Sequence, residues 1–328
     1  MTRPRFMQAL RLVVTLSILF LLWQSFDGAT AMSLVVSADP LWLLAACAAL
    51  TGQTVLSALR WRLTAQHLGQ SFPVGHAVRE YYLSLLVNQS LPGGVVGDAS
   101  RAVRARHEAG LKRSGQAVVF ERLAGQLMLY LVTIAAVTYV WITAVEPALP
   151  GWVLRMIALA ALGMLVAAIS LWWMGRGENA SSRQLGDWTA AFASAVLAPD
   201  VLPRQVMLSL GTTLLNLLAF ALCAQAAGTT LPLTGVMIIV PLILFTMLIP
   251  ISVSGWGLRE GAAAALFPVI GATATEGFAA SVAFGVMFLV STLPGVPFLL
   301  MRSTSDLAST GSDSGQIAGR DHPEESPS

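Results

Sequence analysis

Three pairs of adjacent opposite charges lie in or beside apolar segments of this sequence: Arg79–Glu80, Glu121–Arg122 and Arg259–Glu260. A charged side chain at the centre of a bilayer costs about 2.5 to 3.5 kcal/mol on insertion scales, so charges retained there are functional candidates. Neighbouring residues on a helix point about 100° apart, and we expect none of the three pairs to neutralise itself. Each pair therefore needs partners from another segment. The simplest arrangement gathers all three around one polar chamber.

A polar break, NQSLPGGVVGDASR (88–101), follows the apolar run 74–91. Basic residues flank this run on both sides, so we expect it to enter the membrane and return on the same side. Irregular backbone at membrane depth is tolerated where protein or a water-filled cavity covers it. The break therefore predicts a re-entrant element that lines a cavity and contributes Asn88, Asp98 and Arg101 to it. Asn88 and Asp98 would form its polar floor, and Arg101 would hold an anionic headgroup.

A second break, PISVSGWGLR (250–259), aligns without gaps with residues 92–101. Paired interrupted helices in corresponding positions mark the binding sites of transporters, so an internal repeat is one interpretation. The alternative is chance similarity, because glycine and proline are frequent in this sequence. The matched residues are Pro92 with Pro250, Val95 with Val253, Gly97 with Gly255 and Arg101 with Arg259.

Arginine is the residue best suited to hold a phosphate, because its planar guanidinium donates two parallel hydrogen bonds. The residues predicted to bind and move a substrate are Arg62, Asn88, Asp98, Arg101, Glu121, Arg122, Arg259 and Glu260. The predicted structural hinges are Pro92, Gly93, Gly94, Gly97, Pro250, Gly255 and Gly257. Simpler roles exist for some of these residues. Arg62, like Arg60, can serve only to fix topology, and Glu121 can serve only to complement the dipole of the helix it begins.

The elements that position these residues must be membrane helices. The 328 residues are 55% hydrophobic and 11% charged, against about 25% charged in a soluble domain. We predict an all-α, polytopic membrane helical bundle over 1–302, with an amphipathic connector near 178–204 and a disordered tail over 303–328. About eight crossings are expected, near 10–26, 41–59, 117–145, 152–174, 205–227, 232–249, 258–272 and 278–301.

The distribution of arginine predicts the orientation of the bundle. Arg3, Arg5 and Arg11 precede the first apolar run, and another basic cluster spans 101–113. By the positive-inside rule both termini are cytoplasmic, in a multi-pass protein of a bacterial inner membrane. Ala29-Thr30-Ala31 allows the first run to be interpreted as a cleaved signal peptide, although a retained anchor is the expectation in a chain with so many later spans.

Signatures of most enzymes are missing from the sequence. It contains no GxSxG, HExxH, CxxC or P-loop lysine motif. Cys47 and Cys223 both lie in apolar runs and are expected to be inert hydrophobic residues. We therefore expect no metal, no cofactor and no nucleic acid partner.

Four short motifs, in this order, resemble the transmembrane region of lysylphosphatidylglycerol synthetases, a family also described as flippase-like. They are LRWRL (59–63), NQSLPGGVVGDASRA (88–102), ERL (121–123) and GWGLREG (255–261). The resemblance extends over roughly residues 10–300, although PISVSGWG departs from the glycine-rich turn expected of the family at that point. The residues that match the motifs are Asn88, Pro92, Gly97, Asp98, Arg101, Glu121, Arg122, Gly255, Gly257 and Glu260.

This resemblance implies a bacterial or archaeal inner-membrane protein that moves lipids or lipid-linked molecules between leaflets. Bifunctional members carry a soluble aminoacyl-transferase domain after this region, and here we expect that activity to be absent. The predicted function is translocation of an anionic phospholipid or a lipid-linked glycan. Two alternatives stay open: a scaffold for enzymes of lipid or cell-envelope synthesis, and a lipid-modifying enzyme with Asp98, Glu121 or Glu260 as general base.

Overall fold

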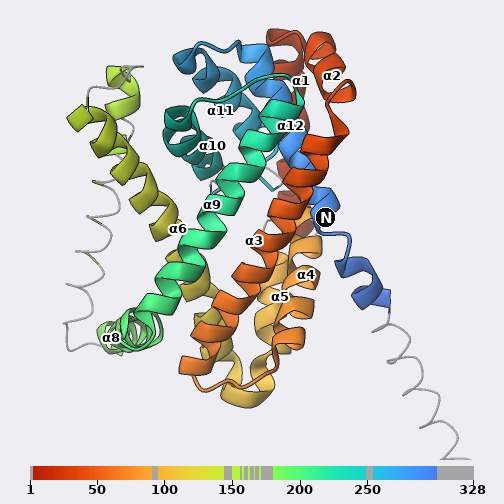
Figure 1. Cartoon of the computed structure of the whole chain (residues 1–328). Helices are drawn as coiled ribbons and strands as arrows, with labels where there is room; N and C mark the ends of the chain where they lie inside the picture. Colours follow the sequence, from red (N-terminus) through yellow and green to blue (C-terminus); the bar gives the residue numbers. More distant parts are fainter. Residues whose placement is uncertain are drawn as a thin grey trace, which may run out of the picture.

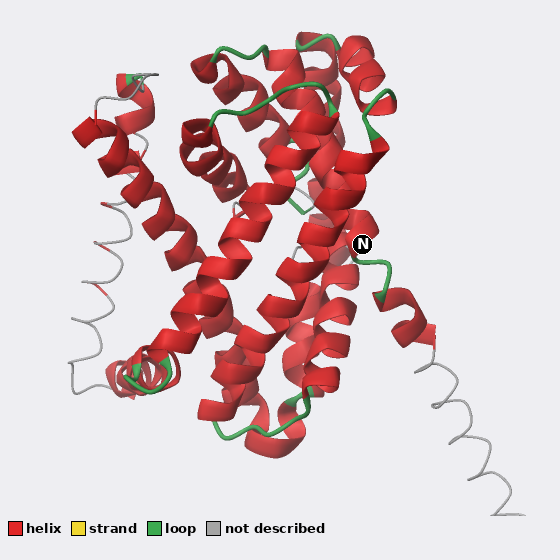
Figure 2. Cartoon of the chain, viewed as in Figure 1, coloured by secondary structure: helices red, strands yellow, loops and turns green. Residues whose placement is uncertain are grey.

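The computed structural model describes residues 3–90, 95–143, 150–155, 157–158, 162, 166, 170, 180–248 and 254–300. Every regular element in these ranges is helical, as Figure 2 shows, so the predicted all-α bundle is confirmed. The α-helices are α1 (Arg3–Ser25), α2 (Gly28–Val36), α3 (Pro40–His67), α4 (Val74–Ser90), α5 (Val96–Arg104), α6 (Arg106–Thr143), α8 (Ala180–Phe192), α9 (Leu202–Ala226), α10 (Val240–Phe245), α11 (Leu258–Leu266) and α12 (Ala274–Ser291).

Two long helices, α3 and α9, pack against each other along the bundle (Figure 1). They are two of the four described helices that are long and apolar enough to cross a membrane, the others being α12 and the part of α6 from Ala109. A fifth span is formed if α1 and α2, which meet at a bend of 96°, are counted together. The predicted spans 232–249 and 258–272 are instead broken into short helices, and most of 152–174 lies outside the described residues.

Helices α4 and α5 form a hairpin that lies beside one half of α3 (Figure 1). At 17 residues α4 is about 25 Å long, which is shorter than the hydrocarbon core of about 30 Å. This geometry agrees with a segment that enters the membrane and returns. The connecting residues 91–94, and with them the predicted hinges Pro92, Gly93 and Gly94, lie outside the described residues.

Gly97 allows the two helices of this hairpin to approach closely. A Cβ at this position would overlap the carbonyl oxygen of Ser84 and lie 2.9 Å from Asn88 Oδ1. We therefore expect Gly97→Ala to lower the free energy of unfolding by about 1 to 3 kcal/mol, the usual cost of overpacking. Denaturant unfolding of the detergent-solubilised protein measures this cost. Gly75→Ala, in the same hairpin but with no atom within 4 Å, is the matched control, and equal effects of the two changes would contradict the prediction.

A second hairpin approaches from the opposite end of the bundle (Figure 1). Its first arm consists of the π-helix Gly235–Ile239, α10 and the 3-10 turn Thr246–Leu248, and its second arm is α11. Gly257, with φ of 89°, forms the left-handed entry to α11. The predicted hinge Pro250 lies outside the described residues. The two hairpins meet where the Ser254 hydroxyl donates to the backbone oxygen of Asn88 at 2.6 Å.

Both hairpins consist of two helical arms, but the aligned arginines lie at different positions along their second arms. Arg101 is the sixth residue of the nine-residue α5, whereas Arg259 is the second residue of the nine-residue α11. The aligned arginines therefore do not occupy equivalent positions on their helices. Both are nevertheless almost completely buried, at 1% and 0% exposure. The structure thus gives each half of the bundle a buried arginine without an exact repeat.

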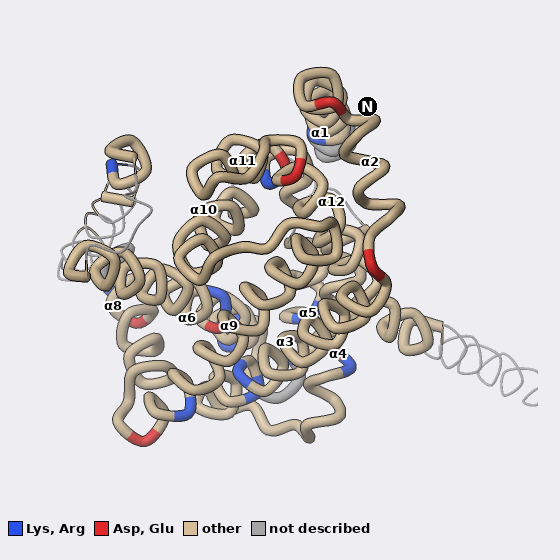
Figure 3. Tube along the Cα trace, turned by 45° about the horizontal axis from the view of Figure 1, so that its top comes forward, with Lys and Arg blue, Asp and Glu red and all other residues tan. Residues whose placement is uncertain are grey.

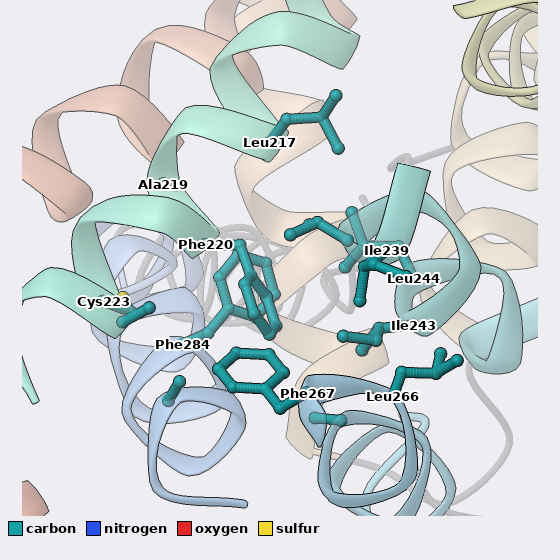
Figure 4. Close-up of a cluster of buried hydrophobic side chains, with 14 of the residues drawn as sticks. Leu217, Ala219, Phe220, Cys223, Ile239, Ile243, Leu244, Leu266, Phe267 and Phe284 are labelled. Carbon is teal, nitrogen blue, oxygen red and sulfur yellow. The ribbon is translucent and has the colours of Figure 1, made fainter. Parts of the chain in front are cut away.

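An apolar core fills the half of the bundle that contains α10, α11 and α12. Figure 4 shows its aromatic centre, where the rings of Phe220 and Phe284 lie 5.2 Å apart and Phe267 packs beside them. The other half has a smaller core around Trp61 and Phe120. The bundle also buries polar and charged side chains, and they form the sites described below.

The predicted amphipathic connector is the helix α8, followed by a π-helix over Ala193–Leu197. Trp188 and Phe192 pack edge to face on Phe120 of α6, with ring centroids at 5.8 and 5.2 Å. The apolar face of α8 is thus directed at α6. The predicted tail, 303–328, lies outside the described residues.

Candidate functional site

Helices α3, α5 and α6 bring three guanidinium groups and two carboxylates together inside the bundle. Arg60 Nη2 lies 2.6 Å from Glu121 Oε1, and Arg101 Nη2 lies 3.1 Å from Asp98 Oδ1 and 3.5 Å from Glu121 Oε2. Arg122 pairs with the second oxygen of Asp98. We call Arg60, Asp98, Arg101, Glu121 and Arg122 the buried arginine cluster. Its three positive and two negative charges leave a net charge of +1. The four buried residues balance one another, and the excess charge belongs to Arg122, whose side chain is 41% exposed.

Arg101 is fixed at the centre of the cluster by aromatic rings. Its guanidinium carbon lies 4.6 Å from the ring centroid of Trp61 and 4.5 Å from that of Tyr81. Cation–π contacts of this kind stabilise a desolvated guanidinium by about 2 kcal/mol. Among the described residues, its Nε and Nη1 atoms have no hydrogen-bond partner. The cluster therefore holds donors that its own carboxylates do not use.

The α4–α5 hairpin positions Asp98. Its carboxylate accepts hydrogen bonds from Ser84 Oγ at 3.0 Å and Asn88 Nδ2 at 3.2 Å. The Asn88 Oδ1 atom in turn accepts from the backbone N–H of Gly97 at 2.8 Å. Of the predicted site residues, the structure thus brings Asn88, Asp98, Arg101, Glu121 and Arg122 together.

A cavity of about 220 Å³ adjoins the cluster. This space is large enough to hold several waters. One wall is charged, with Arg60, Glu121 and Arg122, and the wall formed by α9 is uncharged but polar. Arg60 Nη1 also donates to Thr212 Oγ1 on that wall at 2.9 Å. The other polar lining residues are Gln53, Ser57, Tyr81, Gln126, Thr213 and Asn216.

The apolar crevice, a second space of about 310 Å³, lies on the same side of α6. Leu129 lines the polar cavity, and Val132 and Ala136, about one and two turns further along α6, line this crevice. Leu210 and Leu214 of α9 and Met237 of the π-helix complete much of its wall. The polar cavity and the apolar crevice thus lie one after the other between α6 and α9.

Arg259 and Glu260 form a separate buried pair near the start of α11. Arg259 Nη2 lies 2.5 Å from Glu260 Oε1, and Ser281 Oγ accepts from Arg259 Nε at 3.0 Å. The rings of Trp256 and Phe284 flank the guanidinium at 5.1 and 5.3 Å. Figure 3 shows charged positions both next to α11 and among α5, α6 and α9.

Two predictions fail at this pair. The expectation that no doublet neutralises itself is wrong for Arg259–Glu260, because the Glu260 side chain folds back to accept from the backbone N–H of Gly257 at 2.6 Å and so meets Arg259. The expectation of one chamber also fails, since neither residue lines the cavity beside the buried arginine cluster. The Arg259–Glu260 pair and the buried arginine cluster are thus separate groups of buried charge.

The doublet Arg79–Glu80 and the predicted Arg62 lie outside the cluster. Glu80 pairs with Arg104 of α5, and the Arg79 guanidinium lies 6.0 Å from the ring of Phe298. Arg62 donates from Nε to the backbone oxygen of Phe72 at 2.8 Å and faces away from the cavity. Its predicted role in binding a substrate has no support from this position.

Arg60 and Tyr81 are site residues that the sequence prediction missed. Gln53, Ser57, Arg60 and Thr64 are spaced four, three and four apart, which places them on one face of α3. A similar polar stripe on α9 consists of Gln205, Ser209, Thr212 and Asn216. Reading these stripes would have identified Arg60, rather than Arg62, as the arginine that faces inward.

The chain matches a known protein family over most of its length. The family model described as the lysylphosphatidylglycerol synthase TM region matches residues 8–295. No curated protein matches the chain.

In the described part of the chain, no group of three or more His, Cys, Asp and Glu side chains could hold a metal ion.

Proposed function

Because the chain belongs to the lysylphosphatidylglycerol synthase TM region family, a membrane family related to lipid synthesis and transport, we propose that it moves an anionic lipid between the leaflets. The observation that carries this proposal is the net charge of +1 in the buried arginine cluster, next to a polar cavity inside an apolar bundle. The four buried residues of the cluster balance one another, so the excess positive charge lies on Arg122, which lines the cavity, is partly exposed and is therefore open to an anion. A lipid phosphate is an anion that can pair with this guanidinium through two parallel hydrogen bonds.

The arrangement of the two spaces fits a lipid rather than a soluble anion. The cavity of about 220 Å³ offers polar and charged groups to a headgroup, and the apolar crevice of about 310 Å³ offers a surface for acyl chains. A headgroup that crosses bulk lipid loses its hydration without replacement, which makes crossing slow. A polar cavity within the bundle replaces part of that hydration, so it lowers the barrier.

The state of Glu121 favours transport over group transfer. Its Oε1 accepts from Arg60 and from the Tyr81 hydroxyl at 3.2 Å, and its Oε2 faces Arg101. A carboxylate held by two guanidinium groups is a poor general base, because its lone pairs are already engaged. We therefore propose that the protein has no enzymatic activity of its own and that synthesis enzymes supply its lipid.

The proposal keeps the orientation predicted from arginine, with both termini in the cytoplasm of a bacterium and the bundle in the inner membrane. Asp200 and Glu276 lie at opposite ends of the bundle, near the start of α9 and of α12. In a variant without Cys47 and Cys223, a membrane-impermeant maleimide added to spheroplasts should label Glu276→Cys and leave Asp200→Cys unlabelled. The reverse labelling would invert the orientation.

Lipid exchange in proteoliposomes tests the function. We expect the purified protein to accelerate the movement of an acyl-labelled fluorescent anionic phospholipid between leaflets, measured by quenching of the outer leaflet. Arg122→Gln should slow this movement by about tenfold or more, since a hydrogen bond to a charged group contributes about 1.5 to 3 kcal/mol.

Arg204→Gln is the matched control for this experiment. Arg204 is exposed and does not line the cavity, so the same chemical change there should leave the rate close to that of the unmodified protein. Equal rates for Arg122→Gln and the unmodified protein would contradict a role for the cavity. Absence of any acceleration by the unmodified protein would reject translocation and favour the scaffold hypothesis.

A further inference from the structure

The uncharged wall of the cavity presents hydrogen-bonding groups that no protein atom uses. Gln126 of α6 and Thr213 and Asn216 of α9 line the cavity, and within the described ranges their side chains make no hydrogen bond. Thr213 is only 5% exposed. Gln126 and Asn216 are half-buried. A buried polar group such as that of Thr213 normally has a partner, so these three groups are placed to bond a ligand or the water that a ligand replaces. Hydroxyl groups, which donate and accept, satisfy both amides and the threonine.

The charged wall offers nothing to a cation. Glu121 is the one carboxylate among the described residues that line the cavity, and both of its oxygens face guanidinium groups. Asp98 is likewise occupied by Arg101 and Arg122. An ammonium group entering the cavity would meet a cluster of net charge +1 and find no unpaired carboxylate. Juxtaposed like charges of this kind cost several kcal/mol.

From these two walls we infer the class of lipid that the cavity takes. Its headgroup joins a single phosphodiester to an uncharged, hydroxyl-bearing group such as glycerol or a cyclitol, and lipids with an amino or aminoacyl headgroup are rejected. The phosphate neutralises the charge of +1, while the hydroxyl groups bond Gln126, Thr213 and Asn216. This inference rests on the proposed function, because it names the substrate class of the same site.

Competitive lipid retention tests the inference. The purified full-length chain in detergent is offered an equimolar mixture of phosphatidylglycerol, phosphatidylinositol, phosphatidylethanolamine and lysyl-phosphatidylglycerol, and the bound lipids are counted by native mass spectrometry. We expect the first two to be retained at least about tenfold better than the last two, as like-charge repulsion requires. Retention of lysyl-phosphatidylglycerol equal to or above that of phosphatidylglycerol would overturn the inference.

Asn216 allows an isosteric set of variants. Asn216→Asp adds a carboxylate to the uncharged wall and should shift retention toward the two amino lipids. Asn216→Leu removes the hydrogen-bonding groups and should weaken retention of phosphatidylglycerol without favouring amino lipids. Thermal unfolding midpoints close to that of the unmodified protein establish that both variants are folded. An unchanged retention order in Asn216→Asp would count against the inference.

Retention and leaflet exchange separate this inference from the proposed function. If the protein retains the lipids in the expected order but accelerates the exchange of none, translocation is wrong and the ligand class stands. If it accelerates the exchange of all four lipids equally, translocation stands and the ligand class is wrong.

Discussion

Replacing Glu121 by glutamine should lower the free energy of unfolding by about 3 to 5 kcal/mol, the range for breaking a buried ion pair from one side. Glu121 is 1% exposed and meets Arg60, Arg101 and Tyr81. The change raises the net charge of the buried arginine cluster from +1 to +2. It also turns an amide N–H₂ toward groups that are themselves donors. Denaturant unfolding in detergent and the yield of monodisperse protein measure the loss.

A double-mutant cycle distinguishes this electrostatic cause from a change in packing. Arg60→Met alone leaves Glu121 with a weaker set of partners, and Arg60→Met combined with Glu121→Gln returns the cluster to a net charge of +1. The double variant should therefore be destabilised by less than the sum of the two single variants. Strict additivity would show that the pair is not coupled.

Asp187→Asn is the surface control for Glu121→Gln. Asp187 and Lys112 lie 3.5 Å apart with most of both side chains exposed, and exposed pairs contribute about 0 to 1 kcal/mol. A loss at Asp187 as large as that at Glu121 would mean that burial does not set the strength of these ion pairs.

The sequence was sufficient to predict the helical class and most of the buried arginine cluster. Charges inside an apolar chain are informative because insertion makes them costly, and this argument selected Asp98, Arg101, Glu121 and Arg122. The Pro-Gly break likewise indicated that the chain turns back after α4. Both arguments depend on local composition, which the sequence contains in full.

Pairing between segments was harder to predict, because it depends on how helices rotate and on where side chains turn back. Arg60 and Arg62 are two residues apart, and the direction of each follows from the helical phase set by Gln53 and Ser57. The self-pairing of Arg259 with Glu260 follows from a backbone feature, the left-handed Gly257 at the start of α11. Composition alone fixes neither helix rotation nor the path of a side chain at a helix start.

The second large effect is expected at Glu260, where Glu260→Gln should destabilise the protein by about 3 to 5 kcal/mol. Glu260 and Arg259 are both 0% exposed, and Arg259 would be left with Ser281 and two aromatic faces. The glutamine keeps an oxygen for the backbone N–H of Gly257, so the helix start is preserved and the loss reports the missing charge. Thermal unfolding in detergent measures this loss.

Glu276→Gln tests whether that loss comes from the buried charge or from the helix cap. Glu276 occupies the third position of α12, as Glu260 does in α11, and it accepts from the backbone N–H of Thr273 at 2.6 Å. It is partly exposed and pairs with no arginine among the described residues. Glutamine serves as well as glutamate in such a cap, so Glu276→Gln should change stability by less than about 1 kcal/mol. Similar losses at the two positions would show that capping dominates, and that leaving Arg259 without its carboxylate costs little.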